Sequence, residues 1–166
     1  LGAGFKDSTW AAVTKSDRPH FTTGARMGNI IIEVCETNLD GQMLLERLDG
    51  TDCGAVVSFL GMTRGTDDGE QVLRLEFDAW EERLTPVLEE LAQDAIERHH
   101  VSGVAIAHRT GIVEPGENIV AIHVCAPHRA EAFAACEWLI GELKSSAPLW
   151  KKEVKLSGAI WKAGLG

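Results

Sequence analysis

The chain has 166 residues, of which 45% are hydrophobic and 25% charged, so it is long enough for one well-formed core and too short for two large ones. Its formal net charge of −9 argues against binding along an extended nucleic acid, which requires a basic surface. No apolar run approaches the roughly 18–20 residues that cross a membrane, so no membrane association is expected.

The cysteines show no CxxC spacing, and three of them fall in apolar segments. This pattern favours buried free thiols in a reducing compartment over disulfides, and predicts a cytoplasmic protein. A strand would place His123 and Cys125 on one face, but no second pair of ligands lies nearby, so no metal is expected. No P-loop or Rossmann fingerprint is present, and no cofactor is predicted. The four cysteines are Cys35, Cys53, Cys125 and Cys136.

The amino-terminal part of the chain is rich in Gly, Ser, Thr and Lys and shows no sustained periodicity. We expect residues 1–26 to be a flexible extension or a leader, and residues 27–166 to form the folded domain. The domain would open with residues 30–35, which are apolar and β-branched and predict a strand. Asn38 or Asp40 can then cap a short helix over residues 42–48.

A strand–loop–strand unit is predicted next. Residues 55–60 form a continuous apolar run bounded by glycines, and residues 72–77 alternate apolar and polar side chains. The polar, glycine-containing loop 62–69 lies between them. We interpret the unit as a hairpin with a long, functional tip.

Two long helices and two further strands follow. Residues 80–98 carry an apolar stripe with helical spacing, and residues 128–144 form the second helix. Between them, residues 103–108 and 119–125 predict strands joined through a Pro-Gly turn at 114–117. The side chains that we expect the second helix to bury are Phe133, Ala134, Trp138, Leu139 and Leu143.

Residues 149–156 and 159–161 predict a closing pair of strands. Strands paired in hairpins, with two long helices packed on them, indicate an α+β fold with an antiparallel sheet.

A lysine cluster near the carboxyl end suggests an anion site in this acidic chain. Lys144, Lys151, Lys152 and Lys155 fall within twelve residues, around Pro148. The alternative is a charged helix end followed by a solvated strand. For Lys155 we prefer the solvated interpretation, whereas for Lys144 and Lys151 both stay open. A lysine held against apolar walls loses its proton more easily and becomes a base or nucleophile.

Two further cationic positions are candidates for anion binding. His128 and Arg129 lie at a helix start, where backbone N–H groups favour anions, although they are equally explained as capping residues. Arg64 lies in the loop 62–69 and is alternatively a solvent-facing side chain. Arg129 and Lys144 begin and end one helix, about 22 Å apart at 1.5 Å per residue. If both serve one small substrate, the site must be assembled from two chains across a two-fold axis.

Several short segments, taken together, resemble one known family. They read Met-Thr-Arg, Leu-Glu-Phe-Asp-Ala-Trp, His-Arg-Thr-Gly, Pro-His-Arg, and Leu-Lys followed by Ala-Pro-Leu-Trp-Lys-Lys-Glu, at residues 62–64, 75–80, 108–111, 127–129 and 143–153. In this order and spacing they resemble the large, catalytic subunit of molybdopterin synthase, the MoaE family, over residues 28–161.

The resemblance implies an α/β-hammerhead fold and a central homodimer. Each protomer would bind a small ubiquitin-like sulfur-carrier subunit that ends in a Gly-Gly thiocarboxylate, giving a heterotetramer. The implied reaction, in molybdenum cofactor biosynthesis, transfers two sulfurs to cyclic pyranopterin monophosphate and forms the dithiolene of molybdopterin.

The resemblance also implies roles for particular residues. Lys144 and Lys151 would be catalytic, by proton transfer, by stabilising charge or by transient attack on the acyl group, and these roles stay open. Two alternatives to a sulfurtransferase are a non-catalytic dimeric module that binds a ubiquitin-like carrier and a phosphate or nucleotide sensor. The implied substrate-binding residues are Met62, Thr63, Arg64, Lys152 and Glu153, with His128 and Arg129 coming from the neighbouring protomer.

Overall fold

The computed structural model describes residues 26–27 and 29–162. The predicted amino-terminal extension therefore lies outside the described residues, apart from Arg26, which belongs to a short strand. Its boundary with the folded domain stays a prediction. Within the described ranges, no helix is both long enough and apolar enough to cross a membrane.

The first half of the fold is a sheet with strand order β1-β2-β6-β8-β3. Neighbouring strands are antiparallel except for β2 and β6, which run parallel. The expected antiparallel sheet is thus wrong for this pair, because the chain crosses over several elements before it returns beside β2. All of β6 is buried, as is typical of a strand in a parallel pair. The strands are β1 (Arg26–Met27), β2 (Ile30–Cys35), β6 (Gly103–Arg109), β8 (Asn118–Ala126) and β3 (Ala55–Met62).

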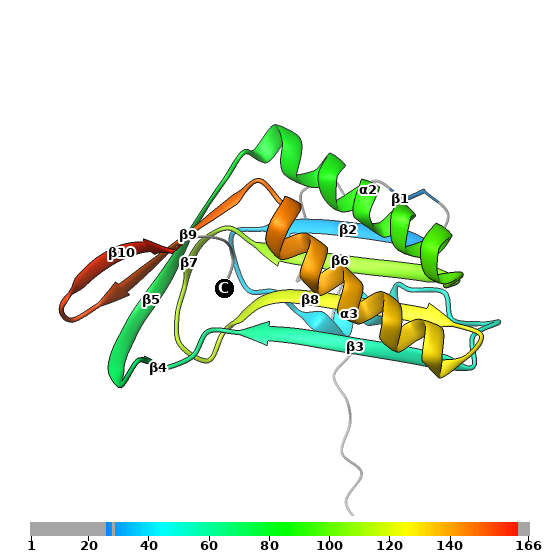
Figure 1. Cartoon of the computed structure of the whole chain (residues 1–166), viewed down its shortest axis with the longest axis horizontal. Coiled ribbons are helices and arrows are strands. Elements are labelled where there is room, and N and C mark those ends of the chain that lie inside the picture. Colours follow the sequence, from blue (N-terminus) through cyan, green and yellow to red (C-terminus); the bar gives the residue numbers. More distant parts are fainter. Residues whose placement is uncertain (1–25, 28, 163–166) are drawn as a thin grey trace, which may run out of the picture.

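Helices α2 (Glu81–His99) and α3 (Arg129–Ser146) lie side by side across one face of this sheet (Figure 1). The apolar stripe of α2 is buried as predicted, with Leu84 and Leu88 fully covered. On α3 the predicted stripe is partly wrong, because Phe133 is 62% exposed and Ala134 is exposed as well. The buried face of α3 instead follows i, i+3, i+4 and i+7 spacing. Its buried residues are Ala132, Ala135, Cys136, Leu139 and Leu143.

A short helix, α1 (Gly41–Glu46), packs on the opposite face of the sheet. Asp40 caps it, since one carboxylate oxygen accepts hydrogen bonds from the backbone N–H groups of Gln42 and Met43 at 3.0 Å. Leu44 fills a small cluster against the sheet. This outcome confirms the second of the two predicted caps.

The second sheet stands at one end of the first and is inclined to it (Figure 1). Its longest strand, β5, pairs with β9 on one side and with β4 and β7 on the other. The hairpin of β9 and β10 confirms the predicted closing pair. The strands are β4 (Thr66–Asp67), β5 (Glu70–Ala79), β7 (Gly111–Val113), β9 (Leu149–Lys155) and β10 (Gly158–Lys162).

The predicted hairpin between residues 55–60 and 72–77 is wrong. These segments belong to β3 and β5, which lie in different sheets. The hairpin is instead the short one between β4 and β5, whose turn residues Asp68 and Gly69 both have positive φ angles, 51° and 77°. Asp-Gly is a preferred pair for this tight turn. The fold belongs to the α+β class that the sequence predicts.

Candidate active site

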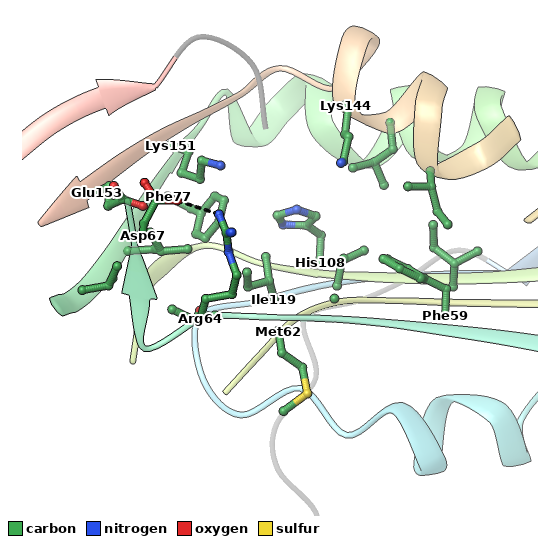
Figure 2. A pocket seen from close by; sticks show the side chains of 18 residues that line it. Phe59, Met62, Arg64, Asp67, Phe77, His108, Ile119, Lys144, Lys151 and Glu153 are labelled. Carbon is green, nitrogen blue, oxygen red and sulfur yellow. Dashed lines mark hydrogen bonds and ion pairs between the residues drawn. The ribbon is translucent and has the colours of Figure 1, made fainter. Parts of the chain in front are cut away.

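A cavity of about 310 Å³ lies where the two sheets meet, beside the end of α3 (Figure 2). Its volume is at the lower end of the range for small-molecule sites. Charged side chains from the second sheet, from α3 and from the loop after β3 open onto it. The apolar walls include Phe59, Leu75, Phe77, Ile119, Ile122 and Leu143.

The segment after β3 borders the cavity with three predicted residues. Thr63 is only 4% exposed, and its backbone N–H donates to the carbonyl of Glu117 at 3.0 Å. Its hydroxyl has no hydrogen-bond partner among the described residues. Arg64 reaches the cavity with a largely exposed side chain. The side chain of Met62 instead points away from the cavity, toward the side of α1 (Figure 2), so Met62 borders it chiefly through its backbone.

The two predicted catalytic lysines reach the same cavity from consecutive elements. Lys144 lies in the last turn of α3, and Lys151 lies on β9. Alternate residues of a strand share a face, so Glu153 lines the cavity together with Lys151. On the neighbouring strand β5, Phe77 is the residue that pairs with Lys151. Burial lowers the pKa of Lys151; Glu153 opposes this shift, and the nearby cations reinforce it. Lys151 therefore gives up its proton more readily than an exposed lysine does.

Three predicted site residues do not line this cavity. Lys152 faces the other side of β9, where its Nζ lies 3.0 Å from a carboxylate oxygen of Glu76 and 6.0 Å from the ring centroid of Trp161. His128 and Arg129 lie at the opposite end of α3 from Lys144. The structure thus confirms that Arg129 and Lys144 belong to one helix and lie near its opposite ends, which at 1.5 Å per residue corresponds to about 22 Å.

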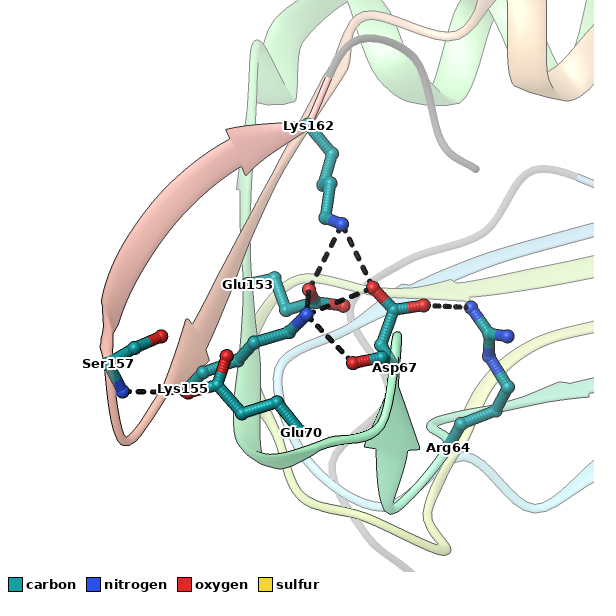
Figure 3. A network of polar contacts seen from close by, with 7 residues as sticks. All are labelled: Arg64, Asp67, Glu70, Glu153, Lys155, Ser157 and Lys162. Carbon is teal, nitrogen blue, oxygen red and sulfur yellow. Dashed lines mark hydrogen bonds and ion pairs between the residues drawn. The ribbon is translucent and has the colours of Figure 1, made fainter.

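A network of ion pairs supports the polar rim of the cavity (Figure 3). One carboxylate oxygen of Asp67 lies 2.8 Å from a guanidinium nitrogen of Arg64. The other oxygen lies 3.2 Å from Nζ of Lys155 and 3.0 Å from Nζ of Lys162. Glu153 also binds Lys155 and Lys162, at 3.2 and 3.1 Å. The expectation that Lys155 is a solvated surface residue is wrong, since its side chain is only 10% exposed.

This network has an electrostatic consequence for Asp67. The hydrogen bonds from Lys162 and Lys155 hold the pKa of Asp67 well below its usual range. Asp67 is therefore ionised at neutral pH and pairs with Arg64. A second carboxylate, that of Glu153, forms ion pairs with the same two lysines.

His108 lines the cavity and had no role assigned from the sequence. Its side chain is 1% exposed, its Nδ1 lies 2.7 Å from the carbonyl oxygen of Arg109, and its ring meets Phe77 edge-on at 5.4 Å between centroids. Burial lowers the pKa of His108 to about 4, so the imidazole is neutral near pH 7. The signal in the sequence was the segment 108–111, which contributed to the family resemblance alone.

The cysteines do not contribute to the cavity lining in the described part of the chain. All four are free, but only Cys125 and Cys136 are buried, so the predicted burial is correct for two of them. Burial raises the pKa of Cys125 to about 12 and that of Cys136 to about 11, which makes both poor nucleophiles. Over residues 26–27 and 29–162, no cluster of three or more His, Cys, Asp or Glu side chains is arranged to hold a metal ion.

The cavity therefore combines an apolar interior, a cationic rim and an amine with a lowered pKa. The cations suit an anionic group such as phosphate, because hydrogen bonds assisted by charge are shorter and stronger than neutral ones. The apolar walls suit a compact ring system. Lys151 is placed to exchange a proton or to attack a carbonyl carbon.

The chain resembles known proteins over most of its length. A family model described as "MoaE protein" matches residues 34–146. The molybdopterin synthase catalytic subunit of Arabidopsis thaliana is 37% identical over 134 residues, which cover 80% of this chain and 68% of that protein.

Solved structures show the same fold. Molybdopterin synthase from Staphylococcus aureus superimposes with a TM-score of 0.75 at 28% identity, over 78% of this chain and 95% of that one. A complex of subunits 1 and 2 of molybdopterin-converting factor from Helicobacter pylori 26695 contains a chain that superimposes with a TM-score of 0.64 at 26% identity. That match covers 78% of this chain and 88% of the other.

Proposed function

This chain belongs to the MoaE protein family, and we propose that it is the catalytic subunit of a molybdopterin synthase, an enzyme of molybdenum cofactor biosynthesis. Its reaction transfers sulfur from a thiocarboxylated carrier to cyclic pyranopterin monophosphate. Two sulfurs enter the pterin side chain, the cyclic phosphate opens, and the dithiolene of molybdopterin results. The observation that carries the proposal is the meeting of Arg64, Lys144 and Lys151 around one cavity, in a chain of this family.

The partner is a small ubiquitin-like subunit whose Gly-Gly end carries the thiocarboxylate. The complex of two subunits in the Helicobacter pylori relative supports a small partner for this chain as well. Two copies of this chain form the central dimer, and one carrier on each copy completes a heterotetramer. Because the carrier supplies the sulfur, the enzyme needs no nucleophilic thiol of its own, and the raised pKa values of the buried cysteines are consistent with that.

The phosphate of the pterin is held by cations from two protomers. Arg64, fixed by Asp67, contributes from one protomer, and His128 and Arg129 contribute from the other. This division follows from the length of α3, whose two ends cannot both reach a single small molecule within one chain. Thr63 and the backbone of Met62 border the same substrate.

Lys144 and Lys151 act on the reacting groups. The lowered pKa of Lys151 makes its neutral amine more accessible than that of an exposed lysine. This amine takes up a proton released in the reaction, or it attacks the acyl carbon of the carrier and displaces the sulfur as sulfide to the pterin, after which water cleaves the acyl-lysine and returns the carrier carboxylate. Lys144 opens onto the same cavity and stabilises negative charge as the phosphate ring opens. Glu153 sets the position of the lysines around it through its ion pairs.

Reconstitution tests this function directly. The purified chain is mixed with thiocarboxylated carrier and cyclic pyranopterin monophosphate, and the dithiolene product is measured after oxidation to a fluorescent pterin. We expect product with the wild type and none with Lys151→Ala. A folded dimer that binds the carrier but forms no product would instead indicate a non-catalytic binding module.

Lys152 supplies a companion test. The resemblance makes Lys152 a substrate-binding residue, whereas in the single chain its side chain lies outside the cavity. If Lys152 contacts the substrate from a second protomer or after rearrangement, Lys152→Ala raises the KM for the pterin. If it serves only to hold Glu76, Lys152→Ala leaves KM unchanged and lowers stability.

A further inference from the structure

The floor of the cavity holds a histidine whose protonation pattern is fixed by a backbone contact. Nδ1 of His108 lies 2.7 Å from the carbonyl oxygen of Arg109. A carbonyl oxygen can only accept a hydrogen bond, so Nδ1 carries the proton. In the neutral imidazole, Nε2 then carries none and can only accept.

The surroundings keep this imidazole neutral. The side chain is 1% exposed, and burial lowers its pKa to about 4. The hydrogen bond to the carbonyl of Arg109 opposes this shift, but the effect of burial is the larger one. The charged residues that line the cavity with His108 are Arg64, Lys144, Lys151, Asp67 and Glu153.

A second neutral polar group lies buried in the wall of the cavity. The hydroxyl of Thr63 is buried and has no hydrogen-bond partner among the described residues, although Thr63 lines the cavity. Buried polar atoms are nearly always paired in folded proteins, so this unpaired hydroxyl is an exception beside the cavity. The neutral acceptor that the cavity itself offers is Nε2 of His108.

Figure 2 shows how these positions are arranged. The ring of His108 rises from β6 toward the side from which Lys144 and Lys151 enter, while Arg64 lies nearer the network of β4 and β9. A ligand that fills the cavity therefore meets charged groups at the rim and a neutral acceptor at the floor. An ionised phosphate has no proton to donate to a neutral acceptor, whereas a heterocycle with N–H groups can donate to it.

We propose that His108 is a specificity-determining residue, whose Nε2 accepts a hydrogen bond from an N–H group on the ring of the bound pterin. This inference rests on the proposed function, which supplies the pterin as ligand. A pterin presents amide and amine N–H groups along one edge of its ring, and its phosphate is held separately by the cations of the rim. A ring without an N–H at that position would leave Nε2 buried and unpaired, and would be rejected for that reason.

Two substitutions separate this role from a structural one. In His108→Asn, the side-chain amide overlays Nδ1 and keeps the hydrogen bond to Arg109, but the acceptor at the Nε2 position is lost. In His108→Gln, an amide oxygen reaches the Nε2 position, but the bond to Arg109 is lost. His108→Asn therefore removes only the acceptor that faces the ligand, and His108→Gln removes only the hydrogen bond to Arg109.

The test is calorimetric titration of each dimer with cyclic pyranopterin monophosphate, beside thermal melting and inhibition of turnover by inorganic phosphate at pH 8. We expect His108→Asn to melt near the wild-type temperature and to bind the pterin about tenfold more weakly or worse, with unchanged phosphate inhibition. We expect His108→Gln to melt lower and to bind within about threefold of the wild type.

The outcomes are distinguishable from those of the proposed function. If the wild type binds the pterin without turning it over, the proposed function fails, and the affinities of the variants still test His108. If His108→Asn binds the pterin as tightly as the wild type, or if affinity simply follows melting temperature in both variants, the role of His108 is overturned. A wild type that does not bind the pterin overturns both.

Discussion

The length of α3 leads to a prediction about how two copies of the chain share each active site. Arg129 begins the helix and Lys144 lies in its last turn, 15 residues and about 22 Å further on. Both side chains are exposed, so truncating either to alanine should leave the fold intact. If each site takes Arg129 from one protomer and Lys144 from the other, the two substitutions complement each other in a mixed dimer.

The expected magnitude follows from counting sites. A dimer of Arg129→Ala with Lys144→Ala has two sites: one combines both defects and the other has neither. Such a dimer should show about half of the wild-type activity, although each variant alone is inactive. If each site were built within one protomer, both sites of the mixed dimer would carry a defect and activity would be near zero.

The assay uses co-expression of the two variants with different affinity tags and tandem purification of the mixed dimer, followed by reconstitution with thiocarboxylated carrier. The matched control is a mixed dimer of the wild type with a chain that carries both substitutions. For shared sites this control is inactive, and for sites within one protomer it keeps about half of the activity. An inactive mixed dimer beside a half-active control would refute the shared site.

Three further predictions concern the network, the buried histidine and the core. Asp67→Asn removes the carboxylate that fixes Arg64, so we expect the KM for the pterin to rise about tenfold, as the loss of a charge-assisted contact predicts, with carrier binding unchanged in a pull-down. His108 has a folded-state pKa of about 4 against 6.5 when unfolded, so the unfolded chain binds more protons in this window and stability falls as pH drops from 6.5 to 4. Between pH 7 and 5 this loss is about 2 kcal/mol, and urea titrations should show that His108→Asn lacks it; an equal acid dependence in both proteins would contradict the assignment. Leu139→Ala empties a fully buried position beneath α3 and should lower the free energy of unfolding by about 2–5 kcal/mol, measured by the same titrations; a loss below about 1 kcal/mol would contradict the packing.

Local patterns in the sequence were sufficient for most helices and strands but not for their pairing. The alternation in residues 72–77 identified β5, yet nothing local says that β5 pairs with β9 rather than with β3. Strand pairing depends on contacts between segments that are distant in the sequence. The turn at Asp68 and Gly69, which forms the observed hairpin, lies within residues 62–69, all of which the sequence predicts as one loop.

The same contrast between local patterns and distant contacts applies to the residues of the candidate site. Lys144 and Lys151 were singled out because they lie in a short, unusual segment, and both line the cavity, while their catalytic role stays a prediction. Lys155 was misjudged because its partner Asp67 lies 88 residues away in the sequence. His108 looked like an ordinary residue of a buried strand, and only the fold shows that it lines a cavity.

The cavity belongs to neither sheet alone, and this couples binding to folding. Its walls come from β3, β6 and β8 on one side and from β5 and β9 on the other, so it exists only while the two sheets stay docked. A molecule bound in the cavity contacts both sheets. It therefore stabilises the docked state to an extent that grows with its concentration and affinity. Ligand should therefore slow amide hydrogen exchange in β10, which pairs with β9 but contributes no residue to the cavity lining.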